Sequence, residues 1–579
     1  MAGLFLVQTR DPLFADGAMA GARAQFARHG FGAPSEREIP GWRVLHAPYE
    51  KGGPETFFAR GEDFAAVAGT FTCDGKMGAG ALEALLAMEA PDWGRIGGQF
   101  VALVHRAEVT RLFTDYFGAF QLFHDAGMRL FSTSLLSAAG ALPRLSFDAQ
   151  GVYEFAFNVV PIGDDTVFAE LKMLGPDRIV TLGPGGATVD AVGKPLPESE
   201  AMPLAERIAA HRDRLMAIVS AHVGQFGDNV FCPLSGGLDS RLALAALRAA
   251  GCSPNIYVYG DAGSADVRIA REIAAAQGFA LDVLDKEGWA APTPDQFPEI
   301  VARNFEIYDA LPNYGELFEN GANAMAREAR HQGGALAVSG GCGEIFRNFF
   351  FLPNRRFSAA AVARTFYARY AKGDVTHAFD ESAFLRALED KILAALGRAG
   401  DRAPLPRALV EQIYPRVRCR ALFGREISIE ARCGAYLMPF LDQHIVAEAM
   451  TLPLGFKNAG RFEAMLLNAI DPALARLPSA YDHDFAGPPS LGHRFGEWST
   501  RIRPVALRQR SYALRRRMGP VADEHGGLLS PDFMGRVVDL DYPAMRRFFR
   551  TGDIADSGMM RRIANLEYLA ARLGSKLAA

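Results

Sequence analysis

The chain has 579 residues, of which 49% are hydrophobic and 22% are charged, and its formal net charge at pH 7 is −4. This composition is typical of a folded protein of two or three domains and argues against extensive disorder. The weak negative charge gives no general reason to expect binding to nucleic acid or to a membrane surface. No uncharged apolar run approaches the ~20 residues of a membrane span, and the first residues do not resemble a signal peptide, so a cytoplasmic location is expected. The six cysteines form no Cys-x-x-Cys pair, which predicts reduced, buried thiols.

Residues 1–195 have short, alternating apolar runs that predict layered β-sheet with a few helices. Two neighbouring strands and the turn that follows them are predicted at 99–105, 109–114 and 115–118. Clusters of glycine and proline at 183–186 and 195–197 indicate a linker to the rest of the chain.

Residues 200–579 have apolar residues at helical spacing, interrupted by short apolar runs. The predicted order is a helix at 204–223, a strand at 229–234, a helix ending near 250, a strand at 255–259, a helix at 264–277 and a strand at 280–284. Alternating strands and helices are typical of a parallel α/β sheet. The remainder of the chain is predicted to be mainly helical.

One short stretch is rich in arginine: Arg501, Arg503, Arg508, Arg510, Arg515, Arg516 and Arg517. Such a run is either a solvated helix face or a contact surface for an acidic partner, a peptide or lipid headgroups.

The most informative residues lie between the strand predicted at 229–234 and the next helix. They are Leu234, Ser235, Gly236, Gly237, Leu238, Asp239 and Ser240. Glycines let backbone N–H groups approach phosphate oxygens closely, serine hydroxyls add donors, and a helix N-terminus favours an anion. Since Asp239 alone would repel phosphate, Mg²⁺ is expected between them. The loop lacks the lysine of a GxxxxGK[ST] motif, and its residue types also occur in ordinary turns.

The run Ser-Gly-Gly-x-Asp-Ser resembles the pyrophosphate loop of the ATP pyrophosphatase (PP-loop) superfamily. The surrounding chain resembles its asparagine-synthetase branch, which includes asparagine synthetase, β-lactam synthetase and lasso-peptide cyclases. The other similar segments are 97–100, 114–118 and 131–134 in the first half, and Asp266, Ser339–Glu344 and Pro439–Asp442 in the second. The resemblance implies a glutaminase-like (Ntn-hydrolase-type) layered β-sandwich domain over 1–195. It implies an asparagine synthetase-like ATP pyrophosphatase domain, with a parallel α/β sheet and many helices, over 200–579.

The chemistry that the resemblance implies is activation of a carboxylate. AMP passes from ATP to the carboxylate, pyrophosphate leaves, and an amine then displaces AMP to form an amide. Asp239 and Glu344 would hold Mg²⁺, and Val258, Tyr259 and Gly340 would join the loop in binding the nucleotide.

Several residues depart from the family pattern. Position 2 is Ala2 and the first cysteine is Cys73, so no thiolate is available at the start of the chain and glutamine hydrolysis is not expected. The amine is then a group on the substrate itself or free ammonia. No lysine lies in 478–485, where the family has one that steadies the adenylate. His483 is a candidate positive charge or base; the alternative cations are Lys457 and Arg461. The family's Glu or Tyr near the acyl group is Gly341 here, and no residue is assigned as the base that deprotonates the amine.

The run Glu344–Pro353 is strongly aromatic and is either a wall for a peptide-sized substrate or ordinary core packing. We expect a lasso-type cyclase that joins a core peptide's α-amine to an Asp or Glu side chain. The alternatives are an ammonia-dependent asparagine synthetase or β-lactam-synthetase-like ligase, and a non-catalytic nucleotide- or peptide-binding scaffold. The expected partners are the peptide or small-molecule carboxylate, a leader-peptide-binding element and a leader peptidase. No nucleic-acid partner is expected.

Overall fold

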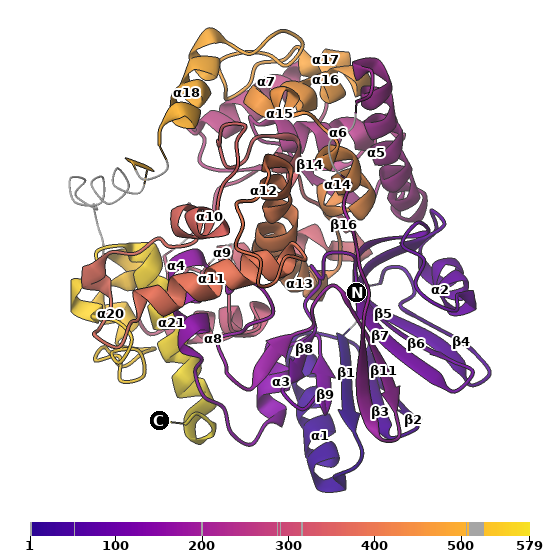
Figure 1. Cartoon of the computed structure of the whole chain (residues 1–579), viewed down its shortest axis with the longest axis vertical. Coiled ribbons are helices and arrows are strands. Elements are labelled where there is room, and N and C mark those ends of the chain that lie inside the picture. Colours follow the sequence, from indigo (N-terminus) through magenta and orange to yellow (C-terminus); the bar gives the residue numbers. More distant parts are fainter. Residues whose placement is uncertain are drawn as a thin grey trace.

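The computed structural model describes residues 3–50, 52–197, 201–286, 288–289, 291–313, 316–504, 507–508 and 526–578. They form a mixed α/β protein with two antiparallel six-stranded sheets and one parallel five-stranded sheet (Figure 1). Ala2 and four of the clustered arginines, Arg510 and Arg515 to Arg517, lie outside the described residues.

The first half contains the two antiparallel sheets. One has the strand order β10-β8-β9-β1-β3-β2, and the other has the order β12-β11-β7-β6-β5-β4. The strands of the first are β1 (Gly3–Gln8), β2 (Ser35–Ile39), β3 (Trp42–Ala47), β8 (Phe123–Asp125), β9 (Leu130–Ser132) and β10 (Leu171–Met173). Those of the second are β4 (Phe57–Arg60), β5 (Asp63–Cys73), β6 (Ile96–Arg106), β7 (Val109–Thr114), β11 (Arg178–Gly183) and β12 (Gly186–Ala191).

Alternation along β5 explains the layers of this half. Phe64 and Ala66 belong to the core shared with the first sheet, whereas Ala65 and Val67 pack with Leu82 of α2 on the opposite face. Helices α1 (Pro12–Arg28) and α3 (Leu135–Ala141) pack on the first sheet, and α2 (Gly78–Ala87) packs on the second. A strand buried on both faces accounts for the small and apolar residues of β5. The layered β-sheet with a few helices predicted for this half is confirmed.

The glycine and proline cluster at 183–186 is a hairpin turn and not a linker. Gly183 pairs with Gly186, and β11 and β12 run antiparallel on either side. The passage to the second half comes later, through 192–197, and it packs on the first half: Lys194 is buried and its ammonium donates to the Asp115 carbonyl over 3.0 Å.

The second half is built around the parallel sheet, whose order is β15-β14-β13-β16-β17. Its strands are β13 (Val230–Pro233), β14 (Asn255–Tyr259), β15 (Asp282–Leu284), β16 (Leu336–Val338) and β17 (Ala435–Leu437), and all neighbours are parallel. The connecting helices α5 (Leu204–Phe226), α6 (Leu238–Ala249) and α7 (Ala265–Gln277) confirm the predicted alternation of helix and strand. The strand order reverses at β13, because β14 lies on one side of it and β16 on the other.

Helix α4 (Ala149–Asn158) belongs to the first half. After β15, helices are the main regular secondary structure of the described residues, as predicted. They are α8 (Phe297–Ile307), α9 (Ala322–Arg330), α10 (Ala359–Phe366), α11 (Glu381–Ala395), α12 (Arg407–Ile413), α13 (Gly424–Cys433), α14 (Gln443–Met450), α15 (Leu454–Lys457), α16 (Arg461–Ile470), α17 (Pro472–Ala475), α18 (Leu491–Ile502), α20 (Pro531–Met534) and α21 (Ser557–Leu573). Among the described residues, no helix combines the length and the apolar character that crossing a bilayer requires. All six cysteines are buried and free, as predicted.

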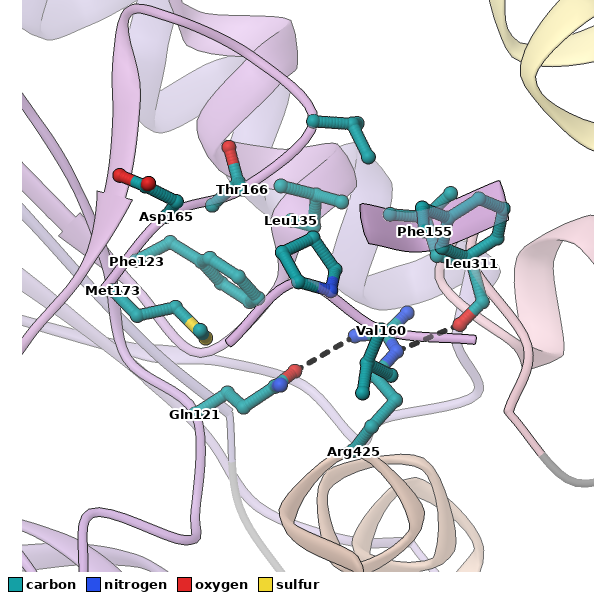
Figure 2. A pocket seen from close by; sticks show the side chains of 12 residues that line it. Gln121, Phe123, Leu135, Phe155, Val160, Asp165, Thr166, Met173, Leu311 and Arg425 are labelled. Carbon is teal, nitrogen blue, oxygen red and sulfur yellow. Dashed lines mark hydrogen bonds between the residues drawn. The ribbon is translucent and has the colours of Figure 1, made fainter. Parts of the chain in front are cut away.

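The two halves share one hydrophobic core and several polar contacts. Arg425 of α13 donates to Gln121 of the first half over 3.0 Å and to the Leu311 carbonyl over 2.7 Å (Figure 2). The gap beside these residues has a volume of about 30 Å³, which is room for about one water molecule and not for a ligand. Near the C-terminal end of the chain, Leu577 pairs with Leu145 of the first half.

Candidate functional site

The loop at 234–240 lies where the strand order of the parallel sheet reverses. It leaves the carboxyl end of β13 and enters α6, which is the position where open α/β sheets bind ligands. Leu234 and Leu238 are buried and anchor the loop, while Ser235 and Gly237 between them, and Asp239 after Leu238, are partly exposed. Since α6 begins without a side-chain cap, its first N–H groups are available to an anion.

Hydrogen bonds hold the loop in a closed turn. The Ser235 N–H donates to Ser240 Oγ over 3.0 Å, the two serine hydroxyls lie 2.8 Å apart, and the Gly237 N–H donates to Ser235 Oγ over 3.2 Å. The Gly236 N–H donates to Asp266 Oδ1, from the first turn of α7, over 2.8 Å. The loop amides therefore already bind one anionic oxygen from the protein itself.

A second loop, after β16, packs against the first. A Cβ atom on Gly340 would lie 2.8 Å from Ser240 N, and a Cβ atom on Gly343 would lie 1.9 Å from Asp239 Oδ1. Neither space admits a side chain. Gly341 is packed in the same way against Met438, whose Cε would lie 2.9 Å from an added Cβ. The glycines of this segment therefore allow the second loop to touch the N-terminus of α6.

The partner of Asp239 is Arg347. Arg347 Nη2 lies 2.7 Å from Asp239 Oδ1, and Arg347 Nε lies 2.8 Å from Glu463 Oε2 in α16. Burial raises the pKa of Glu463 well above its usual range, Arg347 opposes this effect, and the charge of Asp239 adds to it. Arg347 and Glu463 were not predicted, because an arginine inside an aromatic run gives no sequence signal for a site.

Glu344, the other expected Mg²⁺ ligand, lies in the second loop and accepts a hydrogen bond from the Tyr414 hydroxyl over 2.5 Å. Burial raises the pKa of the Cys342 thiol, and Cys419, Glu344 and Asp239 add to this rise. Gly343, which precedes Glu344, packs against the Asp239 carboxylate. In the part of the chain that the structure describes, no group of three or more His, Cys, Asp or Glu side chains could hold a metal ion. Two carboxylates supply hard oxygen ligands for Mg²⁺, and phosphate oxygens would have to supply the rest.

His483 and Arg347 line the same cavity, which has a volume of about 140 Å³. Its wall also contains Leu238, Tyr481 and His493. The His483 ring is held by its Nδ1, which lies 2.7 Å from the Tyr481 carbonyl oxygen. Through Arg347, this cavity adjoins Asp239, so the structure brings His483 to the same side of the molecule as the loop.

Lys457 and Arg461 do not join this group. The buried Lys457 ammonium lies 3.1 Å from Glu411 Oε2 and donates to the Ile345 carbonyl over 2.9 Å. Burial lowers the pKa of Lys457, and Glu411 opposes this effect. Lys457 therefore supports the segment behind Glu344, and Arg461 is exposed at the start of α16.

The two predicted nucleotide-binding residues of β14 differ in their surroundings. Val258 is buried inside the sheet. Tyr259, at the carboxyl end of the strand, has the Lys286 ammonium 3.6 Å from its ring centroid.

The aromatic run at 344–353 contributes mostly to the core. Phe346 and Phe350 are fully buried, whereas Phe351 is partly exposed and lines the cavity beside Arg347. Ordinary packing therefore accounts for the first two, and one aromatic ring of this run faces the cavity.

The Pro439–Asp442 segment joins the two halves. Asp442 Oδ2 accepts a hydrogen bond from the Gly98 N–H of β6 over 3.2 Å, and Asp442 caps α14. Gly98 belongs to the segment 97–100. Two segments that resemble the family's motifs, 97–100 and 439–442, are therefore in contact.

A second cavity of about 310 Å³ was not predicted. It is lined by Arg28, His29, Gly30, Tyr49, Arg303, Glu306, Ile307, Glu328, Arg432 and Cys433. Burial and the charge of Arg432 lower the pKa of His29 to about 3.

Comparisons with known proteins do not assign the chain to a family. No protein-family model and no curated protein matches the chain. Among solved structures, the chain is similar to an allosteric regulatory enzyme of purine biosynthesis, at 9% identity over 49% of this chain and 80% of that one, with a TM-score of 0.24. It is also similar to glutamine phosphoribosylpyrophosphate amidotransferase from B. subtilis complexed with ADP and GMP, at 9% identity over 51% of this chain and 82% of that one, with a TM-score of 0.23. These values support no argument, so the description of the chain as a mixed α/β protein rests on its own sheets and helices.

Proposed function

We propose that this protein is an ATP-dependent, AMP-forming carbon–nitrogen ligase of the asparagine-synthetase type. The observation on which the proposal rests is the position of the Ser-Gly-Gly-Leu-Asp-Ser loop. It lies between the central parallel strand and an uncapped helix, at the reversal of strand order. The proposal assigns residues 200–579 to a PP-loop synthetase domain and residues 1–195 to a glutaminase-like domain without its nucleophile.

The loop residues suit a nucleotide's phosphates. The hydroxyls of Ser235 and Ser240 and the first N–H groups of α6 are donors for phosphate oxygens, and the guanidinium of Arg347 adds a positive charge beside them. Asp266 would release the Gly236 N–H when a phosphate takes its place. Bound Mg²⁺, held by Asp239 and Glu344, would neutralise phosphate charge.

His483 is our candidate for the group that receives the proton of the attacking amine. Its ring lines the cavity next to Arg347, and a ring nitrogen of histidine can accept a proton as a general base. The guanidinium of Arg347 would stabilise the negative charge of the adenylate, the role for which the family uses the lysine that is absent from 478–485.

The walls of the cavity favour a peptide substrate over free aspartate. Phe351, Tyr481, Phe485 and two histidines line the cavity together with the guanidinium of Arg347, so it offers aromatic walls and one cation to a bound group. A volume of about 140 Å³ equals about five water molecules, which suits one acidic side chain while the rest of a peptide lies outside. We therefore favour a lasso-type cyclase over a β-lactam-synthetase-like or ammonia-dependent ligase.

The ion pair between Arg347 and Asp239 favours one alternative, a non-catalytic nucleotide-binding scaffold. Asp239 already has a cationic partner 2.7 Å away, so its carboxylate is a weaker ligand for Mg²⁺ than a free one would be.

The test is a product analysis. The full chain is incubated with ATP, Mg²⁺ and candidate peptides that contain Asp or Glu. Formation of AMP and pyrophosphate, with loss of one water from the peptide mass, supports the cyclase. AMP formation with aspartate and ammonium alone supports the small-molecule ligase, and ATP binding without turnover supports the scaffold. Release of ADP and phosphate, or failure to bind ATP, contradicts the proposed site.

A further inference from the structure

Helix α18 exposes a continuous apolar stripe. Its exposed side chains, with their exposed fractions, are Leu491 (79%), Phe495 (66%), Trp498 (46%) and Ile502 (56%). The spacing of four, three and four residues places them on one face of the helix. The Phe495 and Trp498 rings lie 5.6 Å apart, centroid to centroid. No residue of α18 is buried, so the described residues cover the stripe only in part.

The opposite face fixes the orientation of the helix. His493 and Glu497 line the 140 Å³ cavity, and Glu497 Oε2 accepts a hydrogen bond from the Ala459 N–H over 2.6 Å. The stripe therefore points away from the protein.

Basic side chains flank the stripe. Arg494, Arg501 and Arg503 lie on α18 or directly after it and form no ion pair with any residue that the structure describes. Arg508 donates to the Phe350 and Phe351 carbonyls and ties the chain beyond α18 to the protein. The sequence continues with Arg510 and Arg515 to Arg517, outside the described residues.

We propose that α18 docks on an anionic lipid surface, with the apolar stripe among the acyl chains and the arginines at the headgroups. Helices that lie in the membrane interface combine Trp, Phe and Leu on one face with arginine beside it, and the arginines match the negative charge of anionic lipids. Figure 1 shows α18 at the outer edge of the molecule. A projecting helix suits a lipid surface, whereas a peptide binds in a groove, and none of the four stripe residues lines the adjoining cavity.

Docking in this orientation would bring the cavity behind α18 close to the lipid surface. The inference does not depend on the reaction proposed above, since it rests on α18 and its arginines alone.

The experiment is co-flotation of the full chain with vesicles. We expect binding to vesicles that contain phosphatidylglycerol, weaker binding as salt increases, and little binding to pure phosphatidylcholine. The double variant Phe495→Ser/Trp498→Ser is expected to lose about tenfold or more in binding, and Arg501→Gln/Arg503→Gln is expected to weaken binding to the anionic vesicles selectively. Leu13→Ser is the matched control, because Leu13 is 87% exposed on α1 and its loss should leave binding unchanged.

Tryptophan fluorescence provides a second readout. The chain has four tryptophans, and we expect anionic vesicles to shift the emission to shorter wavelength in the wild type but not in Trp498→Phe, which still binds. No binding to anionic vesicles, or equal binding by the wild type and the double serine variant, overturns the proposal. A change from dimer to monomer in the double variant, without vesicle binding by the wild type, would also overturn it and identify the stripe as a contact between copies.

Discussion

Arg347 Nη2 lies 2.7 Å from Asp239 Oδ1 and connects the first turn of α6 to the buried carboxylate of Glu463. The pair places a fixed cation beside the loop at 234–240. It also makes the stability of this region depend on charges that are largely removed from water.

Replacing Arg347 with Met should destabilise the protein by about 3 kcal/mol, because the Asp239 carboxylate and the buried Glu463 carboxyl would then lie together without the cation that compensates them. The double variant Arg347→Met/Glu463→Gln should recover part of this loss. Denaturant unfolding measures both. The control is Arg303→Met, which breaks an exposed pair with Glu328 and should cost less than about 1 kcal/mol. Equal losses at the two positions would show that the Arg347 pair contributes nothing beyond a surface contact.

Ser235→Ala or Asp239→Ala should abolish AMP formation while the protein stays folded. Ser235 orders the loop through its bonds to Gly237 and Ser240, and Asp239 would hold Mg²⁺. The measurement is AMP formation, with circular dichroism to check folding. Ser137→Ala serves as the control, because Ser137 Oγ is buried without a hydrogen-bond partner. Normal AMP formation by either loop variant would contradict the assigned role.

Gly343→Ala should displace the Asp239 carboxylate, since the new Cβ would lie 1.9 Å from Asp239 Oδ1. We expect a loss of about 1–3 kcal/mol of stability from overpacking, together with reduced AMP formation. Gly373→Ala is the matched control because nothing lies within 4 Å of its added Cβ. If both variants behave like the wild type in both assays, the close approach of the two loops does not matter for the site.

Buried His29 should make the protein less stable in mild acid. Burial and the charge of Arg432 lower the pKa of His29 from 6.5 to about 3, so between these values the unfolded chain binds a proton that the folded chain does not. Stability should therefore fall as pH falls from 6.5, by up to ~1.4 kcal/mol per pH unit from this residue. In urea unfolding, the free energy of unfolding of His29→Gln should depend less steeply on pH below pH 6.5 than that of the wild type. At pH 8, His29 should contribute no such difference between the two proteins. Parallel curves for the two proteins throughout this range would refute the assignment.

The parallel sheet contains strands that could be predicted from the sequence and strands that could not. Val230–Pro233 and Asn255–Tyr259 are apolar runs next to glycine turns and long periodic helices, and their positions were predicted well. Leu336–Val338 and Ala435–Leu437 have three residues each. They are too short for a periodic signal, so the reversal of strand order at β13 could not be predicted from the sequence.

In the candidate site, too, only residues that lie close together in the sequence could be predicted. The loop at 234–240 was predicted because its glycines and serines lie together in the sequence. Arg347 and Glu463 are 116 residues apart and meet only because the second loop packs on the start of α6. The hairpin at 183–186 was mistaken for a linker because glycine and proline occur in both kinds of segment.

The pairing of Leu577 with Leu145 has a consequence for biosynthesis. Residues near 577 cover a strip of the first half, and the Leu145 N–H donates to the Lys576 carbonyl there. During translation the first half leaves the ribosome hundreds of residues before the segment around 577. The surface that this segment covers therefore remains exposed to solvent until the segment is available. Final docking of this surface is therefore delayed until the segment around 577 has been synthesised, and exposed surface of this kind favours aggregation of a nascent chain.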